Sequence, residues 1–273
     1  NLIYGDTDSA YLTLDKMLEA VGEGQDLDEI VEIADTVGEV TNLAFPDFCM
    51  HAFNCPEDRA GVIKTARETV SDKSLFLSKK RYILHVVDDE GKRVDKLKIV
   101  GVELKKSDTS IAIKKLLGEL VNMILDGLEM DHVLDAIDDM RRSFTEFTPH
   151  EIAKPISIKT LRKCEDVLAA TGSDKGFPYQ VRAAMFWNEN CTNLDKRNLS
   201  GEKVALLYIR HPKSKYIAFP IDMVTFPDWF HQFNIDYDTE WEKAKKKLVN
   251  YLTAMGWDVA SRKKAIREDL FGF

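Results

Sequence analysis

The stretch NLIYGDTDSAYLTL (residues 1–14) places two carboxylates, Asp6 and Asp8, between two runs that alternate apolar and polar side chains. Alternation of this kind is typical of β-strands, and glycine and aspartate favour the tight turns that join them. The stretch therefore predicts a β-hairpin with Gly5 and Asp6 at its turn. Such a hairpin would present both carboxylates at its tip.

Two carboxylates this close together repel each other, and a divalent cation would remove that cost. An oxygen-rich pair suits Mg²⁺ or Mn²⁺, and a two-metal phosphoryl-transfer site uses carboxylates in this way. A second interpretation is a solvated turn whose aspartates accept hydrogen bonds from local N–H groups. A calcium-binding EF-hand is disfavoured, because Ala10, Tyr11 and Met17 stand where it needs an oxygen ligand, a glycine and a glutamate.

The first hundred residues continue with a mixture of helix and strand. Between residues 27 and 53 apolar side chains recur with helical spacing, and residues 62–100 return to strand character. The runs RYILHVV (81–87) and RVDKLKIV (93–100) flank DDEGK (88–92), whose Asp-Glu-Gly is typical of a hairpin turn. We expect one long helix and four or five antiparallel strands in this part of the chain.

The rest of the chain has mostly helical spacing. SDTSIAIKKLLGELVNMIL predicts a helix capped by Ser107 or Asp108, and a second helix is expected over residues 131–144. YQVRAAMFWNENC and TEWEKAKKKLVNYLTAMG predict two more helices, the latter with Thr239 and Glu242 at capping-box spacing. KVALLYIR and YIAFPI predict a short strand pair.

The fold class is therefore α+β, with charge distributed unevenly along the chain. The 273 residues carry a net charge of −8, yet residues 1–60 hold 14 acidic and 2 basic side chains while residues 61–120 hold 14 basic and 9 acidic ones. This asymmetry suits a protein that binds cations in one region and a polyanion in another, although solvated charged faces would also produce it. No apolar run has the length of a membrane helix, so no membrane partner is expected.

Several motifs together resemble one protein family. YGDTDS (residues 4–9) resembles motif C of the family B DNA polymerases, the palm-domain hairpin that carries catalytic aspartates. KKRY (79–82) resembles the palm motif that tracks primer–template DNA, and KLKIVGVELKKSDTS (96–110) resembles the palm-to-thumb junction of the T-even-type bacteriophage polymerases. GFPYQVRAAMFWN, GEKVALLYIR and the terminal DLFGF are similar to the thumb and tail of that group.

The resemblance covers essentially the whole chain and implies a domain plan. The C-terminal part of a palm would occupy residues 1–101, a mostly helical thumb residues 102–267, and a clamp-binding tail residues 268–273. The implied function is that of a replicative DNA-directed DNA polymerase, a nucleotidyltransferase acting in the cytoplasm of an infected bacterial host cell. Its implied partners are primer–template DNA, dNTP and a sliding clamp.

The resemblance also implies roles for single residues. Asp8 is similar to the aspartate that bridges two Mg²⁺ ions, with Mn²⁺ as a substitute, and Asp6 is similar to the first motif aspartate, whose metal contact is less direct. Glu68, in ARETV, is similar to an acidic palm residue near the metals, although a surface carboxylate on a strand explains it as well.

The basic motifs imply binding to DNA that does not read its sequence. We expect KKRY to head an extended strand and to offer cationic and hydrogen-bonding contacts to phosphates or groove acceptors. Lys105 and Lys106, just before the predicted helix, would hold the primer backbone, although they would also fit a charged face that is exposed to solvent. The residues expected to bind DNA are Lys79, Lys80, Arg81, Tyr82, Lys105 and Lys106.

The terminal peptide IREDLFGF ends in apolar side chains. In the T-even-type polymerases a similar peptide docks on the sliding clamp, which implies that Leu270, Phe271 and Phe273 are clamp-binding anchors. The alternative is that these side chains fold back onto their own domain.

Other strings of the family are missing from the sequence. The sequence contains neither motif A, with its catalytic aspartate, nor motif B of the fingers, with its lysine and tyrosine. It also lacks the set of carboxylates of the exonuclease domain. We therefore expect the C-terminal portion of a polymerase that is inactive alone and needs an N-terminal portion with exonuclease, motif A and fingers. The alternative from another class is a non-catalytic DNA- and clamp-binding module.

Overall fold

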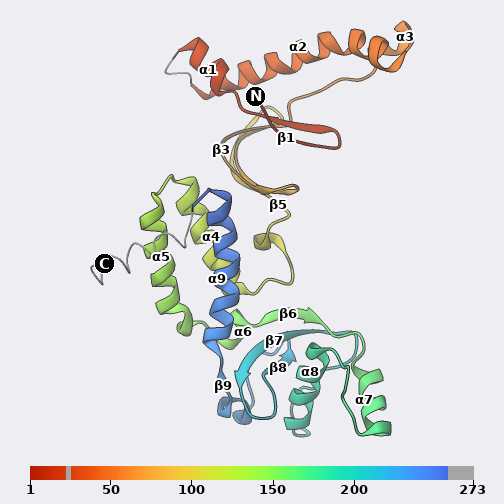
Figure 1. Ribbon diagram of the computed structural model, residues 1–273, viewed down its shortest axis with the longest axis vertical. Helices are drawn as coiled ribbons and strands as arrows, with labels where there is room; N and C mark the ends of the chain where they lie inside the picture. The colour runs from red at the N-terminus through yellow and green to blue at the C-terminus, as the bar shows by residue number, and fades with distance from the viewer. Residues whose placement is uncertain (23–25, 258–273) are drawn as a thin grey trace, which may run out of the picture. The chain divides into compact units, whose positions relative to one another are not determined.

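The computed structural model describes residues 1–22 and 26–257, and the chain forms two compact units, Asn1–Val100 and Gly101–Phe273. The elements of the first unit are β1 (Leu2–Asp6), β2 (Ser9–Leu12), α1 (Asp15–Val21), α2 (Leu27–Phe53), α3 (Glu57–Ala60), β3 (Thr69–Ser78), β4 (Arg81–Asp89) and β5 (Lys92–Val100) (Figure 1). Strands β1 and β2 form an antiparallel hairpin, and β3-β4-β5 form a three-stranded antiparallel sheet.

Local signals explain where these elements begin and end. Helix α2 covers the predicted residues and begins with a capping box, in which Asp26 and Glu29 each accept a backbone hydrogen bond from the other residue. Strands β4 and β5 are joined at Glu90 and Gly91, whose φ angles of 51° and 84° are both left-handed. That geometry is typical of the two-residue hairpin turn predicted for DDEGK, and the prediction is confirmed.

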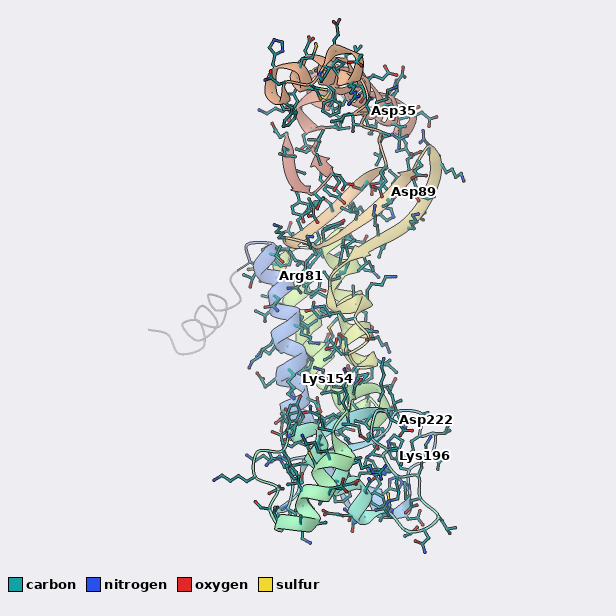
Figure 2. The ribbon with its side chains drawn as sticks, turned by 90° about the vertical axis from the view of Figure 1, so that its right-hand side faces the viewer. Asp35, Arg81, Asp89, Lys154, Lys196 and Asp222 are labelled. Carbon is teal, nitrogen blue, oxygen red and sulfur yellow. The ribbon has the colours of Figure 1, made fainter. Side chains whose placement is uncertain are left out.

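A buried carboxylate links helix α2 to the sheet. The Asp88 side chain on β4 has no exposed surface, and it pairs with both Arg67 and Arg93. Arg67 also binds Asp35 on α2, labelled in Figure 2, at 2.5 Å, while Arg93 also binds Asp28 on α2. Burial raises the pKa of Asp88, but the hydrogen bonds from its partners outweigh burial and leave the pKa below its usual value.

The second unit combines helices with a small sheet. Its elements are η1 (Glu103–Lys105), α4 (Ile111–Leu125), α5 (Met130–Ser143), η2 (Phe144–Glu146), α6 (Pro149–Ile152), β6 (Lys154–Ser157), α7 (Leu161–Thr171), α8 (Tyr179–Asn190), β7 (Lys203–Arg210), β8 (Tyr216–Pro220), η3 (Asp228–Gln232), β9 (Asn234–Ile235) and α9 (Tyr237–Ala254). The predicted pair β7 and β8 is confirmed, and β6 and β9 extend it to an antiparallel sheet that the sequence did not predict.

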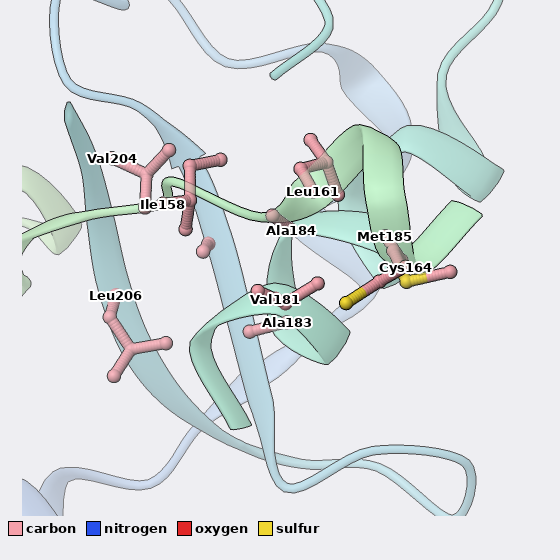
Figure 3. Close-up of a cluster of buried hydrophobic side chains, with 10 residues drawn as sticks. Ile158, Leu161, Cys164, Val181, Ala183, Ala184, Met185, Val204 and Leu206 are labelled. Atoms are coloured by element: carbon pink, nitrogen blue, oxygen red, sulfur yellow. The ribbon is translucent and has the colours of Figure 1, made fainter. Parts of the chain in front are cut away.

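Helices α7 and α8 pack against this sheet through a close-packed apolar cluster (Figure 3). Its buried members are Ile158, Leu161, Cys164, Val181, Ala183, Ala184, Met185, Val204, Leu206 and Ala218. Helix α4 supplies a second apolar stripe, which packs beside α5 and α9. The α+β fold class is confirmed, and no helix within residues 1–22 and 26–257 is long and apolar enough to cross a bilayer.

Two predicted helix caps are wrong. Helix α4 is capped by Ser110, whose hydroxyl accepts the Ile113 N–H at 3.5 Å, because the chain is still turning at residues 107 and 108 after η1. Helix α9 is capped by Asp236, whose carboxylate accepts the Thr239 N–H at 3.2 Å. Thr239 is therefore the third residue inside the helix, where it donates its own hydroxyl to Asp236 at 2.8 Å.

Candidate functional site

The β1–β2 hairpin turns at Thr7 and Asp8, because Asp6 pairs with Ser9 across the ladder. The predicted turn at Gly5 and Asp6 is wrong: both residues belong to β1. The left-handed position is taken by Thr7, with φ of 56°, which is unusual for a β-branched residue. The Thr7 hydroxyl donates to the Asp6 carboxylate at 3.3 Å, a local contact that helps to hold this conformation.

The two carboxylates differ in their surroundings. The Asp6 side chain is 28% exposed and lies 3.4 Å from the Lys80 ammonium group. Asp8 is exposed at the tip, and within the part of the chain that the structure describes its carboxylate has no hydrogen-bond or ion-pair partner. Asp8 therefore offers its lone pairs to an external cation, whereas Asp6 is already partly neutralised.

An aromatic cluster holds the hairpin against the three-stranded sheet. Tyr4 and Tyr11 pack on Phe76 and Tyr82, with ring centroids 5.2 to 6.1 Å apart. The hydroxyl groups of Tyr11 and Tyr82 lie 2.7 Å apart, and Tyr82 is only 8% exposed. Burial, followed by this hydrogen bond, raises the pKa of the Tyr11 hydroxyl. The cluster fixes the hairpin from which the carboxylates project.

The KKRY motif is a turn followed by a strand, and the expectation that all four residues head an extended strand is wrong. Ser78 pairs with Arg81, which leaves Lys79 and Lys80 as the tight turn between β3 and β4, with φ of 60° at Lys80. The Lys80 N–H donates to the Tyr4 hydroxyl at 2.9 Å. Because of this contact and the Asp6–Lys80 pair, the turn lies directly beside the carboxylate hairpin.

The structure does not bring Glu68 to the two aspartates. Glu68 precedes β3, its side chain is 62% exposed, and it pairs with Lys98 on β5 at 2.5 Å. Among the residues described, no three His, Cys, Asp or Glu side chains gather closely enough to hold a metal ion. The hairpin therefore supplies two carboxylates, without a third His, Cys, Asp or Glu side chain beside them among the described residues.

The second unit carries a basic cluster made of Lys106, Lys154, Lys243 and Lys247. Lys106 lies in the loop after η1, Lys154 begins β6, and Lys243 and Lys247 lie on one face of α9. Burial lowers the pKa of Lys243 and Lys247, and the charge of Lys154 lowers both further. Like charges brought together at half-buried positions are unfavourable without a counter-charge, so this cluster favours a polyanionic ligand.

Acidic neighbours compensate the basic cluster only in part. Lys106 lies 3.6 Å from Glu103, and Lys154 lies 3.5 Å from Asp108. Lys105 is the last residue of η1. Of the four cluster lysines, the sequence pattern predicted only Lys106, together with Lys105 outside the cluster. The spacing of Lys243 and Lys247 on one helix face was a usable signal, whereas nothing local marks Lys154.

The expected clamp-binding residues Leu270, Phe271 and Phe273 lie outside the described residues.

Comparisons with known proteins agree with the sequence motifs. Residues 1–161 match the model of DNA polymerase family B. The DNA-directed DNA polymerase of Escherichia phage RB69 is 29% identical over 295 residues, which cover 100% of this chain and 32% of the relative. That of Enterobacteria phage T4 is 27% identical over 242 residues, which cover 79% of this chain and 26% of the relative. This chain spans about a third of the length of these relatives or less. It belongs to DNA polymerase family B.

Proposed function

We propose that this chain supplies part of the active site of a replicative DNA-directed DNA polymerase, with Asp8 and Asp6 as ligands for divalent metal ions. The observation that carries the proposal is the unpaired, exposed carboxylate of Asp8 beside Asp6, within the described residues, on a hairpin held by an aromatic cluster. Membership of DNA polymerase family B supports it, as do relatives that are themselves named DNA-directed DNA polymerases.

The donor set fits Mg²⁺, with Mn²⁺ as a substitute. Mg²⁺ is usually held by one or two carboxylates together with substrate phosphates and water, and the hairpin offers the two carboxylates of Asp6 and Asp8. When bound, such ions supply Lewis-acid chemistry that favours attack by the primer 3′-hydroxyl and departure of pyrophosphate. In this scheme Asp8 provides open lone pairs, and Lys80 moderates the charge of Asp6 while no cation is bound.

The lysines of both units would bind the phosphate backbone of primer–template DNA. Lys79 and Lys80 lie at the exposed turn beside the hairpin, where cationic groups can contact phosphates without reading bases. Tyr82 is buried in the aromatic cluster, so we assign it the task of holding that turn, with Arg81 beside it at the start of β4. Lys105 and the basic cluster would bind the backbone in the second unit.

Nucleotidyl transfer would require residues that this sequence does not contain, namely the motif A aspartate and the dNTP-binding groups of motif B. Apolar side chains on the hairpin support a further protein surface there, because Leu2, Ile3 and Leu12 are 67%, 50% and 47% exposed. We propose that a polymerase portion with exonuclease, motif A and fingers covers them. The terminal apolar peptide would dock on a sliding clamp, and the assembly would act in the cytoplasm of the infected host cell.

Primer extension tests this proposal directly. The chain is mixed with a fragment that carries motifs A and B, and synthesis on a labelled primer–template is followed with dNTPs and Mg²⁺. We expect Asp8→Asn to abolish extension while DNA binding stays intact, and Asp58→Asn, an exposed carboxylate on α3, to behave as wild type. Extension that survives Asp8→Asn would exclude the metal assignment. DNA binding without any synthesis in the wild-type mixture would favour the non-catalytic binding module.

A further inference from the structure

Glu240 is a buried carboxylate that the proposed reaction does not use. It lies in the first turns of α9 and is only 5% exposed. Its carboxylate accepts the N–H of Tyr208 on β7 at 2.9 Å, and the Tyr208 carbonyl accepts the N–H of Asp236 at 3.0 Å. The start of α9 is thereby joined to one residue of the strand. Because burying a carboxylate is costly, its presence calls for a specific role.

Lys243 lies one turn further along the same helix and belongs to the basic cluster. Its ammonium group stands 3.1 Å from the centre of the Tyr208 ring, a cation–π arrangement. The same residue of β7 therefore contacts Glu240 through its backbone and Lys243 through its ring. This geometry connects the carboxylate to a cation that we propose binds DNA.

The two side chains influence each other's protonation. Burial raises the pKa of Glu240 to about 7, while the Tyr208 N–H and Lys243 act in the opposite direction. Burial lowers the pKa of Lys243, and the charge of Glu240 opposes that shift. The groups that face the pair from the surrounding elements are Asp236 at the N-cap of α9, Lys154 on β6, the Tyr208 and Tyr216 hydroxyls on β7 and β8, and Tyr179 on α8. Asp236 is itself paired with Arg210, at 3.2 Å.

We propose that Glu240 is a positioning residue for DNA binding by the second unit: it fixes Tyr208, whose ring contacts Lys243, and its charge sets how strongly the basic cluster attracts a phosphate backbone. This inference rests on the proposed function. When Glu240 is ionised, it offsets the charge of Lys243. When Glu240 is protonated, the cluster presents one more uncompensated positive charge, so DNA binding tightens as the pH falls through neutrality.

The test measures the dissociation constant of a labelled primer–template duplex for the full chain, without Mg²⁺, between about pH 6 and about pH 8 at constant ionic strength. For the wild type we expect the dissociation constant to be roughly three- to tenfold lower at about pH 6 than at about pH 8. An effect of this size is expected because one charge changes and solvent partly screens it from the phosphates. Glu240→Gln keeps an oxygen that can accept the Tyr208 N–H. In this variant DNA binding should be equally tight at about pH 6 and about pH 8, so the pH dependence of the dissociation constant should vanish. Other groups that titrate in this range affect both proteins equally.

Two more variants separate charge from structure. Lys243→Met keeps an unbranched side chain but removes the cation that favours ionised Glu240, so the pH step should move to higher pH. Glu242→Gln removes an exposed carboxylate from the same helix and should leave the wild-type profile. Thermal unfolding of each variant checks that it is folded.

Each remaining outcome is decisive. Equal pH profiles for wild type and Glu240→Gln, or a parallel loss of affinity at every pH, would overturn the role of Glu240 and indicate a structural one. If Lys243→Ala and Lys247→Ala both leave the dissociation constant unchanged at every pH, then DNA binding by the basic cluster itself fails, and the inference fails with it.

Discussion

The hydrogen bond between Tyr11 and Tyr82 joins the carboxylate hairpin to the strand of the KKRY motif, and a double-mutant cycle measures it. Each tyrosine is changed to phenylalanine, singly and together, so that the ring packing is kept and only hydroxyl groups are removed. In the structure the two oxygens lie 2.7 Å apart, and no other hydrogen bond of either hydroxyl is found among the described residues. The loss of one hydroxyl therefore leaves the other unpaired.

The surroundings of the two hydroxyls set the expected magnitudes. Tyr82 is 8% exposed, so Tyr11→Phe strands a buried hydroxyl and should lower the free energy of unfolding by about 2 kcal/mol. Tyr11 is half-buried and can reach water, so Tyr82→Phe should cost about 1 kcal/mol. The double variant removes both polar groups together and should cost about 1 kcal/mol, because no unpaired group is left. The coupling energy is then about 2 kcal/mol.

Urea unfolding of the four proteins, followed by circular dichroism and by tyrosine fluorescence, supplies the free energies. Both probes must give the same transition for the cycle to be interpreted, since the chain has two compact units. If the double variant loses the sum of the two single losses, within about 0.5 kcal/mol, then the hydroxyls are not coupled and ring packing alone holds the hairpin.

Two further predictions concern charged groups of the first unit. Asp88→Asn should lower the free energy of unfolding by about 3 kcal/mol near neutral pH, the low end for a broken buried pair, since both arginine partners keep a second carboxylate. Because the pKa of Asp88 is depressed, this difference should be present above about pH 4 and disappear as the pH falls through the folded-state pKa. His85 lies 2.6 Å from Asp72 and 2.7 Å from Asp95, and first Asp72 and then Asp95 raises its pKa. His85→Asn should therefore be most destabilising below about pH 6.5, and its effect should fade as the pH rises through the folded-state pKa.

Urea unfolding at several pH values checks both predictions, with Asp58→Asn as a control that should show no pH-dependent difference. An Asp88→Asn effect that persists unchanged in strong acid would show that packing, and not charge, explains the loss. A His85→Asn effect that grows with pH would contradict the assigned direction of the histidine pKa.

Short-range signals determined much of this protein from its sequence alone. The capping box at Asp26 and the apolar spacing behind it set α2, and Glu90 with Gly91 set the turn between β4 and β5. These features depend on contacts between residues a few positions apart, so the local sequence is sufficient to predict them. The motif YGDTDS was specific enough to indicate family B DNA polymerases, and the comparisons agree.

Tertiary structure decided which of these parts meet. The first hairpin turns at Thr7 and Asp8 instead of the predicted Gly5 and Asp6, because the packing of Tyr4 and Tyr11 on the sheet sets the strand register. It placed Lys80 beside Asp6, and it brought Lys154 close to two lysines of α9. Such contacts join residues far apart along the chain, so no local pattern encodes them, and only the burial of apolar surface brings them together.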